Sequence, residues 1–485
     1  MQINTILRLV GLLIGLFSTT MLVPIIVALI YQDGAGIVFI RSLFMSLLIA
    51  FLFWYPNRAH QEELRTRSGF LIVVLFWVVL GTIGAIPFIF SEKPNLSVTD
   101  SFFESFSALT TTGATLIVGL DSLPKAILIY RHLLQWLGGM GIIVLAVAIL
   151  PLLGIGGMQL YRAETPGPVK DNKMTPRIAE TAKALWYIYL TLTIVCACAY
   201  WLAGMSVFDA IGHAFSTIAI GGFSSHDASL GYFNSTTINM ICSIFLVISA
   251  VNFSLHFAVF SSAGLNLKTY FYDTEFKFFI FLQCLLIVIC FLVLLSAKIY
   301  QNGFVALDHA IIQSVSISTT AGFATQSFAE WPSFLPVLLI ISSFVGGCAG
   351  STGGGLKAIR IWLLMLQSNR ELKRLVHPRA LFSISIGKKA LPEQVIDAVW
   401  GFFFAYVFIF IICLLGLLAT DMDIITAASA AAACLNNLGP GLGDVASHYA
   451  DIHDQAKWIL ILAMLFGRLE VFTLLILFTP TFWKH

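Results

Sequence analysis

Charged residues are scarce in this chain. Only 11% of its 485 residues are Asp, Glu, Lys or Arg, whereas 58% are hydrophobic, and the mean hydropathy is +0.91. A soluble protein needs far more charge to coat its surface, so the composition excludes a water-soluble domain. The formal net charge of +2 gives no sign of a nucleic-acid partner, and none is expected.

The sequence also lacks the side-chain clusters of an enzyme or a metalloprotein. Its eight cysteines all lie inside apolar segments, and none forms a CxxC or a Cys/His metal spacing. We interpret them as buried small hydrophobic residues. An enzyme would need a convergent nucleophile, base or metal cluster. A Walker A phosphate loop fails because Gly355 and Lys357 are not adjacent and no strand precedes them. The chain is therefore predicted to be neither an enzyme nor the carrier of an organic cofactor.

Long apolar runs, in contrast, are abundant. About ten of them reach the roughly 20 residues that a helix needs to cross a membrane, at approximately 5–31, 36–55, 69–90, 126–153, 183–204, 236–262, 277–299, 333–364, 396–419 and 456–480. The first is too long for a signal peptide and ends at Tyr31 without an A-x-A-like cleavage site, so we expect it to remain as a helix. These runs predict an all-α polytopic membrane protein.

The few charges are distributed unevenly between the runs. Basic residues gather in the segments 57–68, 151–181 and 367–394, which are cytoplasmic by the positive-inside rule. The opposite segments carry seven acidic residues and a single lysine, and are 91–100, 224–236, 324–335 and 441–455. They are predicted to face outside, where an acidic rim concentrates cations. This topology places the N-terminus in the cytoplasm.

A long-period repeat lies between the helices. From residue 69 onward the runs form pairs, and within each pair a shorter stretch begins with Asp and reaches a glycine. The four stretches begin at Asp100, Asp209, Asp308 and Asp423 and reach Gly113, Gly222, Gly322 and Gly439. These glycines are 109, 100 and 117 residues apart, which indicates one unit per helix pair. The predicted organisation is two leading helices (1–68) and four repeats, 69–181, 182–270, 271–390 and 391–485.

Each repeat reads as helix, pore loop, helix. The four Asp residues are predicted to cap short helices, where their charge suits the positive end of the helix dipole. About 10 to 13 residues form a helix of roughly 15 to 20 Å, which ends near mid-membrane. The carboxyl ends of four such helices would stabilise a cation at one central place. Ordinary glycine turns would explain one or two of the stretches, but not four at matched positions.

The segments around the four glycines are predicted to form the selectivity filter. Irregular backbone at membrane depth must be buried in protein or line water, and glycine permits the positive φ that lets successive carbonyls face one axis. The carbonyls would then replace the hydration shell of an ion. The predicted filter segments are Thr110, Thr111, Thr112 and Gly113; Ala219, Ile220, Gly221 and Gly222; Thr319, Thr320, Ala321 and Gly322; and Asn436, Asn437, Leu438 and Gly439.

The second helix of repeat three is interrupted by GGCAGSTGGG at residues 346–355, of which six are glycine. Each glycine costs a helix about 1 kcal/mol relative to alanine, so this stretch is predicted to be a mobile intramembrane loop that gates the pore. The alternative is a glycine-rich helix-packing surface. The predicted gate residues are Gly346, Gly347, Gly350, Ser351, Thr352, Gly353, Gly354 and Gly355, together with Arg468.

Arg468 lies in the middle of the last apolar run, where a charge costs at least about 2.5 to 3.5 kcal/mol unless it faces protein or water. It would repel cations near the filter or hold the glycine-rich stretch through carbonyl hydrogen bonds. A structural pair with a carboxylate is the alternative, although Glu470 should face another way. The glycines of QWLGGMGI at residues 135–142 are predicted to permit close helix packing rather than chemistry.

Three motifs together resemble the Trk/Ktr/HKT superfamily of potassium and sodium transporters over nearly the whole chain. They are TTTGA at residues 110–114, QWLGGMGI at 135–142 and GGCAGSTGGGLK at 346–357. The resemblance implies pseudo-fourfold repeats around one pore, a homodimer in a bacterial inner membrane and a cytosolic TrkA-like nucleotide-binding ring that gates it. In that superfamily a glycine at the filter position of all four repeats accompanies potassium selectivity, whereas a serine in the first accompanies sodium transport. The fourth repeat departs from a symmetrical filter at Asn436, Asn437 and Pro440.

The leading hypothesis is passive, gated uptake of potassium, with rubidium passing too and K⁺ in the pore as the only cofactor. An ion-coupled secondary transporter would show inverted repeats and paired ionisable groups in the membrane. Here the repeats run in the same orientation, and mid-membrane carboxylates are almost absent. The basic segments 151–181 and 367–394 are the predicted docking surfaces for the regulatory partner, and anionic membrane lipid would explain the same charges.

Overall fold

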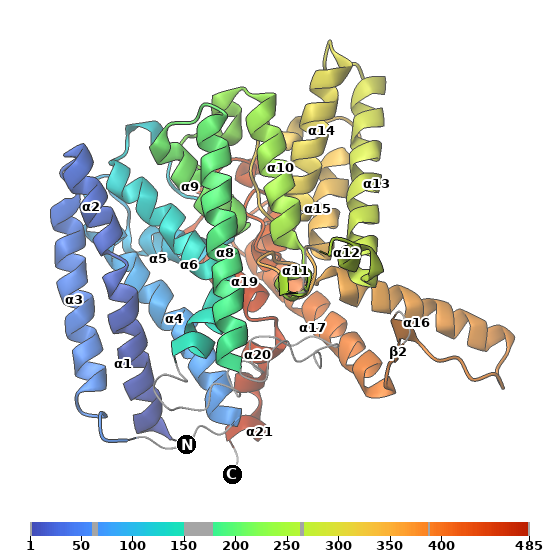
Figure 1. Ribbon diagram of the computed structural model, residues 1–485, viewed down its shortest axis with the longest axis horizontal. Coiled ribbons are helices and arrows are strands. Elements are labelled where there is room, and N and C mark those ends of the chain that lie inside the picture. Colours follow the sequence, from blue (N-terminus) through green and yellow to red (C-terminus); the bar gives the residue numbers. More distant parts are fainter. Residues whose placement is uncertain (1, 61–65, 150–177, 262–265, 387–388, 484–485) are drawn as a thin grey trace.

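The computed structural model describes residues 2–60, 66–149, 178–261, 266–386 and 389–483 of an almost entirely helical chain. Strands in this part are limited to β1 (Ser385–Ile386) and β2 (Lys389–Ala390), which pair antiparallel. The basic segment 151–181 lies largely outside the described residues, as do parts of the segments 57–68 and 367–394. Both chain termini lie at the same end of the helical bundle (Figure 1).

Three helices precede the repeats. They are α1 (Ile3–Thr19), α2 (Leu22–Tyr31) and α3 (Gly36–Trp54), and they stand at one edge of the bundle (Figure 1). α1 and α3 pack backbone to backbone, because a Cβ atom added at Gly11 would lie only 2.7 Å from the Trp54 nitrogen. The first apolar run consists of α1 and α2, which are separated by a short break at residues 20–21.

Each repeat supplies a long helix, a short helix and a returning helix. Repeat one holds α4 (Thr66–Phe90), α5 (Val98–Leu109) and α6 (Lys125–Ile149). Repeat two holds α8 (Ile178–Leu202), α9 (Val207–Ile218), α10 (Thr236–Ala250) and α11 (Phe253–Ser261). Repeat three holds α12 (Lys268–Tyr272), α13 (Thr274–Ser296), α14 (Gly303–Ser318), α15 (Leu335–Val345) and α16 (Ala358–Val376). Repeat four holds α17 (Glu393–Leu418), α18 (Ile424–Leu435), α19 (Asp454–Arg468), α20 (Phe472–Leu475) and α21 (Pro480–Trp483).

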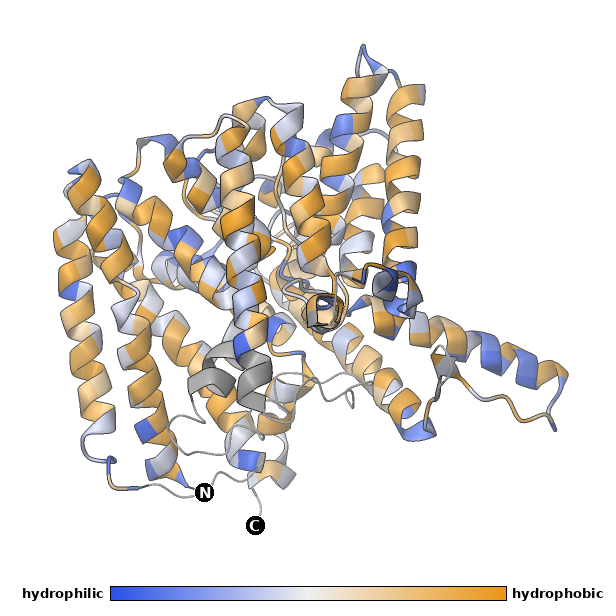
Figure 2. Ribbon diagram, in the orientation of Figure 1, coloured by the Kyte–Doolittle hydropathy of each residue, from blue (hydrophilic) through white to orange (hydrophobic). Residues whose placement is uncertain are grey.

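Apolar side chains cover the outside of the bundle as well as its core. Figure 2 shows them along the long helices, with hydrophilic residues at the helix ends and on the distal part of α16. Phe404 on α17 is 72% exposed and Leu202 on α8 is 82% exposed, which suits surfaces that face lipid. Within the described residues, six helices are long and apolar enough to cross a membrane, or up to eight if two bent pairs count as spans. The chain is a multi-pass membrane protein.

The returning helix is broken in every repeat, whereas the sequence predicted a break only in the third. α10 and α11 meet at 92°, and the segments on either side of the break after Arg468 meet at 108°. In α6 the break falls at Gly141, with φ 61° and ψ −170°. The apolar runs predicted over 236–262 and 456–480 each contain such a break, because hydropathy alone does not register a change in backbone direction.

Repeat three has the longest break. Residues 346–357 separate α15 from α16, and we call this segment the glycine-rich loop. α16 then projects away from the bundle (Figure 1). Its distal half is amphipathic and ends in basic residues, with Lys373 and Arg374 in its last turn.

Candidate functional site

The short helices begin differently from the prediction that all four Asp residues are N-caps. Asp423 does cap α18, since its carboxylate accepts from the backbone N–H groups of residues 425 and 426. In α5 and α9 the cap is a serine three residues earlier, Ser97 or Ser206, whose hydroxyl accepts from the N–H of Asp100 or Asp209 at 3.1 Å. The prediction was wrong for these two because a serine at this spacing captures the free N–H while the acidic residue stays in the first turn.

Asp308 is also not a cap. The helix α14 starts earlier, at Gly303, and its N-cap is Asn302. The side chain of Asp308 instead accepts a 2.7 Å hydrogen bond from the amide of Asn239 on α10. In all four repeats the short helix nevertheless ends directly before the predicted filter segment.

The four filter segments share one backbone conformation. Two residues in each segment have positive φ, namely Thr111 (55°) and Gly113 (79°), Ile220 (54°) and Gly222 (75°), Thr320 (70°) and Gly322 (85°), and Asn437 (55°) and Gly439 (97°). The residues that precede these pairs, such as Thr110 with φ −75°, are right-handed. Because left-handed and right-handed residues alternate, successive carbonyl groups turn toward the same side of the segment. Each non-glycine residue in this conformation costs roughly 1 to 2 kcal/mol, and its fourfold recurrence indicates a functional constraint.

The glycines of the filter segments allow the four segments to touch in cyclic order. A Cβ atom on Gly113, Gly222 or Gly322 would overlap the carbonyl oxygen of Gly221, Ala321 or Leu438 in the next repeat. The fourth contact closes the ring, since a Cβ atom on Gly439 would lie 2.7 Å from the Thr112 oxygen of repeat one. Glycine is thus required at these positions for close approach as well as for backbone hand.

A buried ion pair supports the first two filter segments. Glu104 on α5 and Arg131 on α6 are in contact at 2.7 Å, and both side chains are almost fully buried. Glu104 accepts from the N–H of Leu116 at 3.0 Å, and Arg131 donates to the Ser224 carbonyl at 3.3 Å. The pair therefore ties the chain after the first filter segment to the chain after the second. The sequence argument missed it, although a charge in each of two apolar helices was the available signal.

Gln135 also supports the filter, in contrast to the packing role predicted for its motif. Its amide nitrogen donates to the Gly221 carbonyl at 2.5 Å, and its oxygen accepts from the N–H of Phe223 at 3.1 Å. The glycines of the motif do pack closely, as predicted. A Cβ atom on Gly138 would overlap the Leu109 carbonyl, and one on Gly139 would lie 2.8 Å from the Cα atom of Ala219.

The two asparagines of the fourth segment point into the surrounding protein. The Asn437 amide donates to the Thr112 hydroxyl and to the Met464 carbonyl, each at 3.0 Å. The Asn436 amide donates to the Ser343 hydroxyl at 2.7 Å, and its oxygen accepts from the hydroxyl of Tyr406. Their side chains thus brace the filter, while the backbone of this segment matches the other three. The departure from the threonine-rich pattern affects support rather than backbone geometry.

The glycine-rich loop lies against three of the four filter segments. Its Thr352 hydroxyl donates to the carbonyl of Ile218 at the end of α9, at 3.0 Å. The Gly354 N–H donates to the Thr320 hydroxyl at 2.7 Å, and the Gly355 N–H donates to the Asn436 carbonyl at 3.2 Å. The loop therefore sits at the carboxyl ends of the short helices of repeats two, three and four.

Arg468 joins this loop to repeat one. Its guanidinium donates to the Thr352 carbonyl at 3.0 Å, to the Gly139 carbonyl at 2.9 Å and to the Gly138 carbonyl. Of the two functional roles considered for Arg468, the contacts are those of a residue that holds the loop. Glu470 faces elsewhere and pairs with Arg360 on α16 at 2.5 Å.

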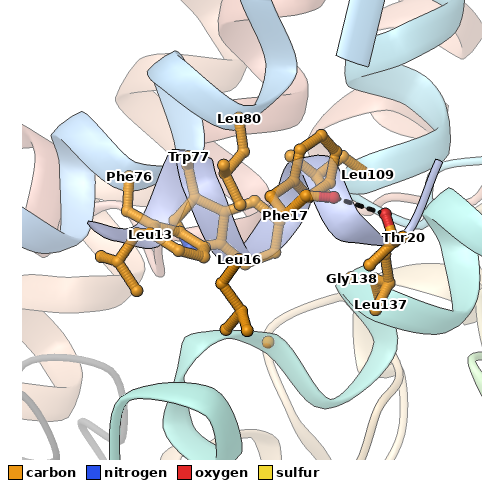
Figure 3. Close-up of a pocket in the computed structure, with 11 residues that line it drawn as sticks. Leu13, Leu16, Phe17, Thr20, Phe76, Trp77, Leu80, Leu109, Leu137 and Gly138 are labelled. Atoms are coloured by element: carbon orange, nitrogen blue, oxygen red, sulfur yellow. Dashed lines mark hydrogen bonds between the residues drawn. The ribbon is translucent and has the colours of Figure 1, made fainter. Parts of the chain in front are cut away.

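An apolar pocket of about 40 Å³ lies behind the first filter segment, between α1, α4 and α6 (Figure 3). Trp77, Leu109 and Gly138 line it, and the hydroxyl of Thr20 at its rim is engaged with the Phe17 carbonyl at 2.7 Å. Such walls offer no ligands to an ion. Polar backbone instead converges at the ring of filter segments and at the loop beneath it.

Comparison with known proteins agrees with this architecture. The chain is 67% identical to the Trk system potassium uptake protein TrkH of Vibrio parahaemolyticus, 63% identical to that of Escherichia coli K12 and 42% identical to the TrkG protein of the latter organism, in each case over 99 to 100% of both chains. The crystal structure of the potassium transporter TrkH from Vibrio parahaemolyticus superimposes with a TM-score of 0.91 at 64% identity, and both chains are covered fully. The cation transport protein family TrkH matches residues 35–485. This chain therefore belongs to the TrkH family of cation transport proteins.

Proposed function

We propose that the chain is a passive, channel-like pore for uptake of potassium and rubidium. The observation that carries this proposal is the ring of four filter segments. Each has the same alternating backbone, each follows the carboxyl end of a short helix, and each touches its neighbour through its glycine. Carbonyl oxygens that converge in this way can replace the hydration shell of a cation.

Potassium is the cation best supported. Gly113, Gly222, Gly322 and Gly439 keep the four segments alike in backbone and in contact, so the ion would meet similar oxygens from every repeat. The relatives that match over full length are named as potassium uptake proteins. In this proposal the filter residues hold K⁺ through main-chain carbonyls, and no residue takes part in covalent chemistry.

The glycine-rich loop is the proposed gate. It contacts repeats two, three and four directly and repeat one through Arg468. A loop that touches every repeat below the filter would block ions until those contacts are released. In this proposal a cytosolic nucleotide-binding subunit of the TrkA type supplies the release.

The proposed membrane, orientation and partner subunits rest on the distribution of charge along the chain and on the similarity to the Trk proteins. The basic segments favour a cytoplasmic N-terminus by the positive-inside rule, and the proposed membrane is the bacterial inner membrane. We also propose a homodimer, with the projecting α16 and the basic segment 367–394 as surfaces for partner subunits or anionic lipid.

Flux through the purified protein in liposomes tests this function. We expect ⁸⁶Rb⁺ uptake driven by an outward potassium gradient, competed by external potassium and resistant to external sodium. Two controls are used. One is liposomes without protein, and the other is liposomes with the Gly113→Ser variant, which changes the filter and leaves the glycine-rich loop intact. Uptake that appears only with an imposed proton or sodium gradient would replace the passive pore with an ion-coupled transporter.

A further inference from the structure

One carboxylate from outside the glycine-rich loop bonds both to that loop and to the first turn of α16. The Glu275 Oε1 atom accepts from the backbone N–H of Ala349 at 2.7 Å and from the backbone N–H of Ile359 at 3.2 Å. Glu275 lies in the first turn of α13, whose N-cap is Asp273. An acidic residue at this place commonly faces the N-terminus of its own helix. Here its oxygen serves two amides of another segment.

The same loop is bonded to the preceding repeat. The Cys348 N–H donates to the Ala250 carbonyl at 2.8 Å, and the Phe253 N–H donates to the Gly350 carbonyl at 3.1 Å. These contacts fall at the break between α10 and α11. The loop therefore rests between the bend of repeat two on one side and Glu275 on the other.

Helices α11 and α12 connect these two supports, and we call them the elbow. Within it the His256 ring bonds to the Tyr270 hydroxyl at 2.7 Å, and it also bonds to the Ile248 carbonyl of α10 at 2.9 Å. The α12 helix of the elbow packs against α13, and α13 packs against α16. Because α12 ends at Tyr272 and α13 begins at Thr274, a displacement of the elbow would be transmitted to the first turn of α13, which carries Glu275.

We propose that Glu275 is the latch of the glycine-rich loop: its carboxylate holds the loop shut by tying Ala349 of the loop and Ile359 at the start of α16 to α13, and displacement of the elbow opens the pore by withdrawing it. This rests on the proposed gate function of the loop. Glu275 is a positioning residue, since it touches loop amides and not the ion path. The amides of residue 349 in the loop and residue 359 in α16 lose their acceptor when the carboxylate leaves, so removal of Glu275 favours the released loop.

The test compares ⁸⁶Rb⁺ uptake by the full-length protein in liposomes, without a partner, for Glu275→Ala and Glu275→Gln. We expect Glu275→Ala to raise uptake at least tenfold, equivalent to about 1.4 kcal/mol, with unchanged discrimination between potassium and sodium. Glu275→Gln keeps an acceptor oxygen without the charge, so we expect a smaller rise. It also provides a second variant where the alanine protein folds poorly. Lys277→Ala removes an exposed charge from the same helix end and should leave uptake unchanged.

A second measurement reports the loop directly. Cys348 is 1% exposed and adjoins Ala349, so its reaction with a water-soluble maleimide measures release of this end of the loop. Reaction is located by mass spectrometry of the peptide that contains Cys348. We expect it to be several-fold faster in Glu275→Ala and unchanged in Lys277→Ala.

Deletion of residues 351–354 separates the two proposals. If the deletion raises uptake while Glu275→Ala changes neither uptake nor Cys348 reactivity, the gate stands and the latch is refuted. If the deletion does not raise uptake in correctly folded protein, the gate is refuted and the latch falls with it. A loss of ion discrimination in Glu275→Ala would mean that the residue supports the filter, which also overturns the latch.

Discussion

Substitution of Gly113 by serine tests the central feature of the site. Gly113 has φ +79°, and a Cβ atom there would overlap the carbonyl oxygen of Gly221 at well under 3.0 Å. Serine therefore imposes two separate penalties. It strains the backbone of the first filter segment, and it pushes the second segment out of the ring.

The sizes of the two penalties follow from the geometry. A left-handed non-glycine residue costs roughly 1 to 2 kcal/mol, a strain that Thr111, two residues before Gly113, already bears. Forcing extra atoms into packed structure costs about 1 to 3 kcal/mol more. The second penalty falls on the Gly221 carbonyl, which Gln135 also holds. We expect this distortion to weaken binding of potassium more than binding of sodium. A difference of about 1.4 kcal/mol between the two ions corresponds to a factor of ten, so the ratio of potassium to sodium flux should fall at least about tenfold.

Gly119 offers a matched control in the same return segment. Its φ is +83°, but the nearest atom to an added Cβ is the Ser122 hydroxyl oxygen at 3.7 Å. Gly119→Ser thus reproduces the backbone strain without the clash. We would measure ⁸⁶Rb⁺ and ²²Na⁺ uptake side by side for both variants. Unchanged ion ratios in folded Gly113→Ser, or equal losses in Gly119→Ser, would refute the assignment of this ring as the filter.

One deletion and two substitutions address the supports of the ring. Deletion of residues 351–354 removes the loop contacts below the filter, so we expect ⁸⁶Rb⁺ uptake by the isolated protein to rise at least about tenfold. Lower uptake by folded protein would argue against a gate. Arg468→Gln should raise uptake in the same assay, because a neutral side chain holds the loop carbonyls less strongly; wild-type flux would contradict that role. Glu104→Gln leaves Arg131 buried without its countercharge and should lower the unfolding free energy by about 3 to 5 kcal/mol. The exposed Glu92→Gln is its control in thermal unfolding, and equal midpoints would show that the pair contributes little.

The sequence predicted the features that repeat along the chain. Four glycines at near-constant spacing, each after a short apolar stretch, predicted the short helices and the turns that follow them, because each such pattern lies within one short stretch of sequence. The arrangement of the four repeats around one pore came from the family resemblance. The structure places positive φ at all four of these glycines and brings them into contact in cyclic order. Lipid exposure of long helices follows equally well from composition. These inferences required no knowledge of which repeat contacts which.

Features that depend on distant partners could not be predicted in this way. The caps of α5 and α9 are Ser97 and Ser206 because a nearby serine outcompeted the aspartate that marks each repeat. Val471, with φ 30°, lies at a break that hydropathy passes over. Gln135 supports the second filter segment only through its approach to Gly221 in another repeat. A single sequence carries no record of such long-range contacts.

The four repeats are alike in backbone and unlike in what braces them. Repeat one uses the Glu104–Arg131 ion pair, and repeat four uses two buried asparagines. Among the described residues, a long loop below the ring occurs in repeat three alone. An ion that is bound by carbonyls responds to the positions of those oxygens and not to the side chains behind them. The repeats were therefore free to diverge in their supports, provided that the ring stayed intact. A gate built into one repeat, with its contacts spread over all four, needs no change in the filter itself to open or close the path.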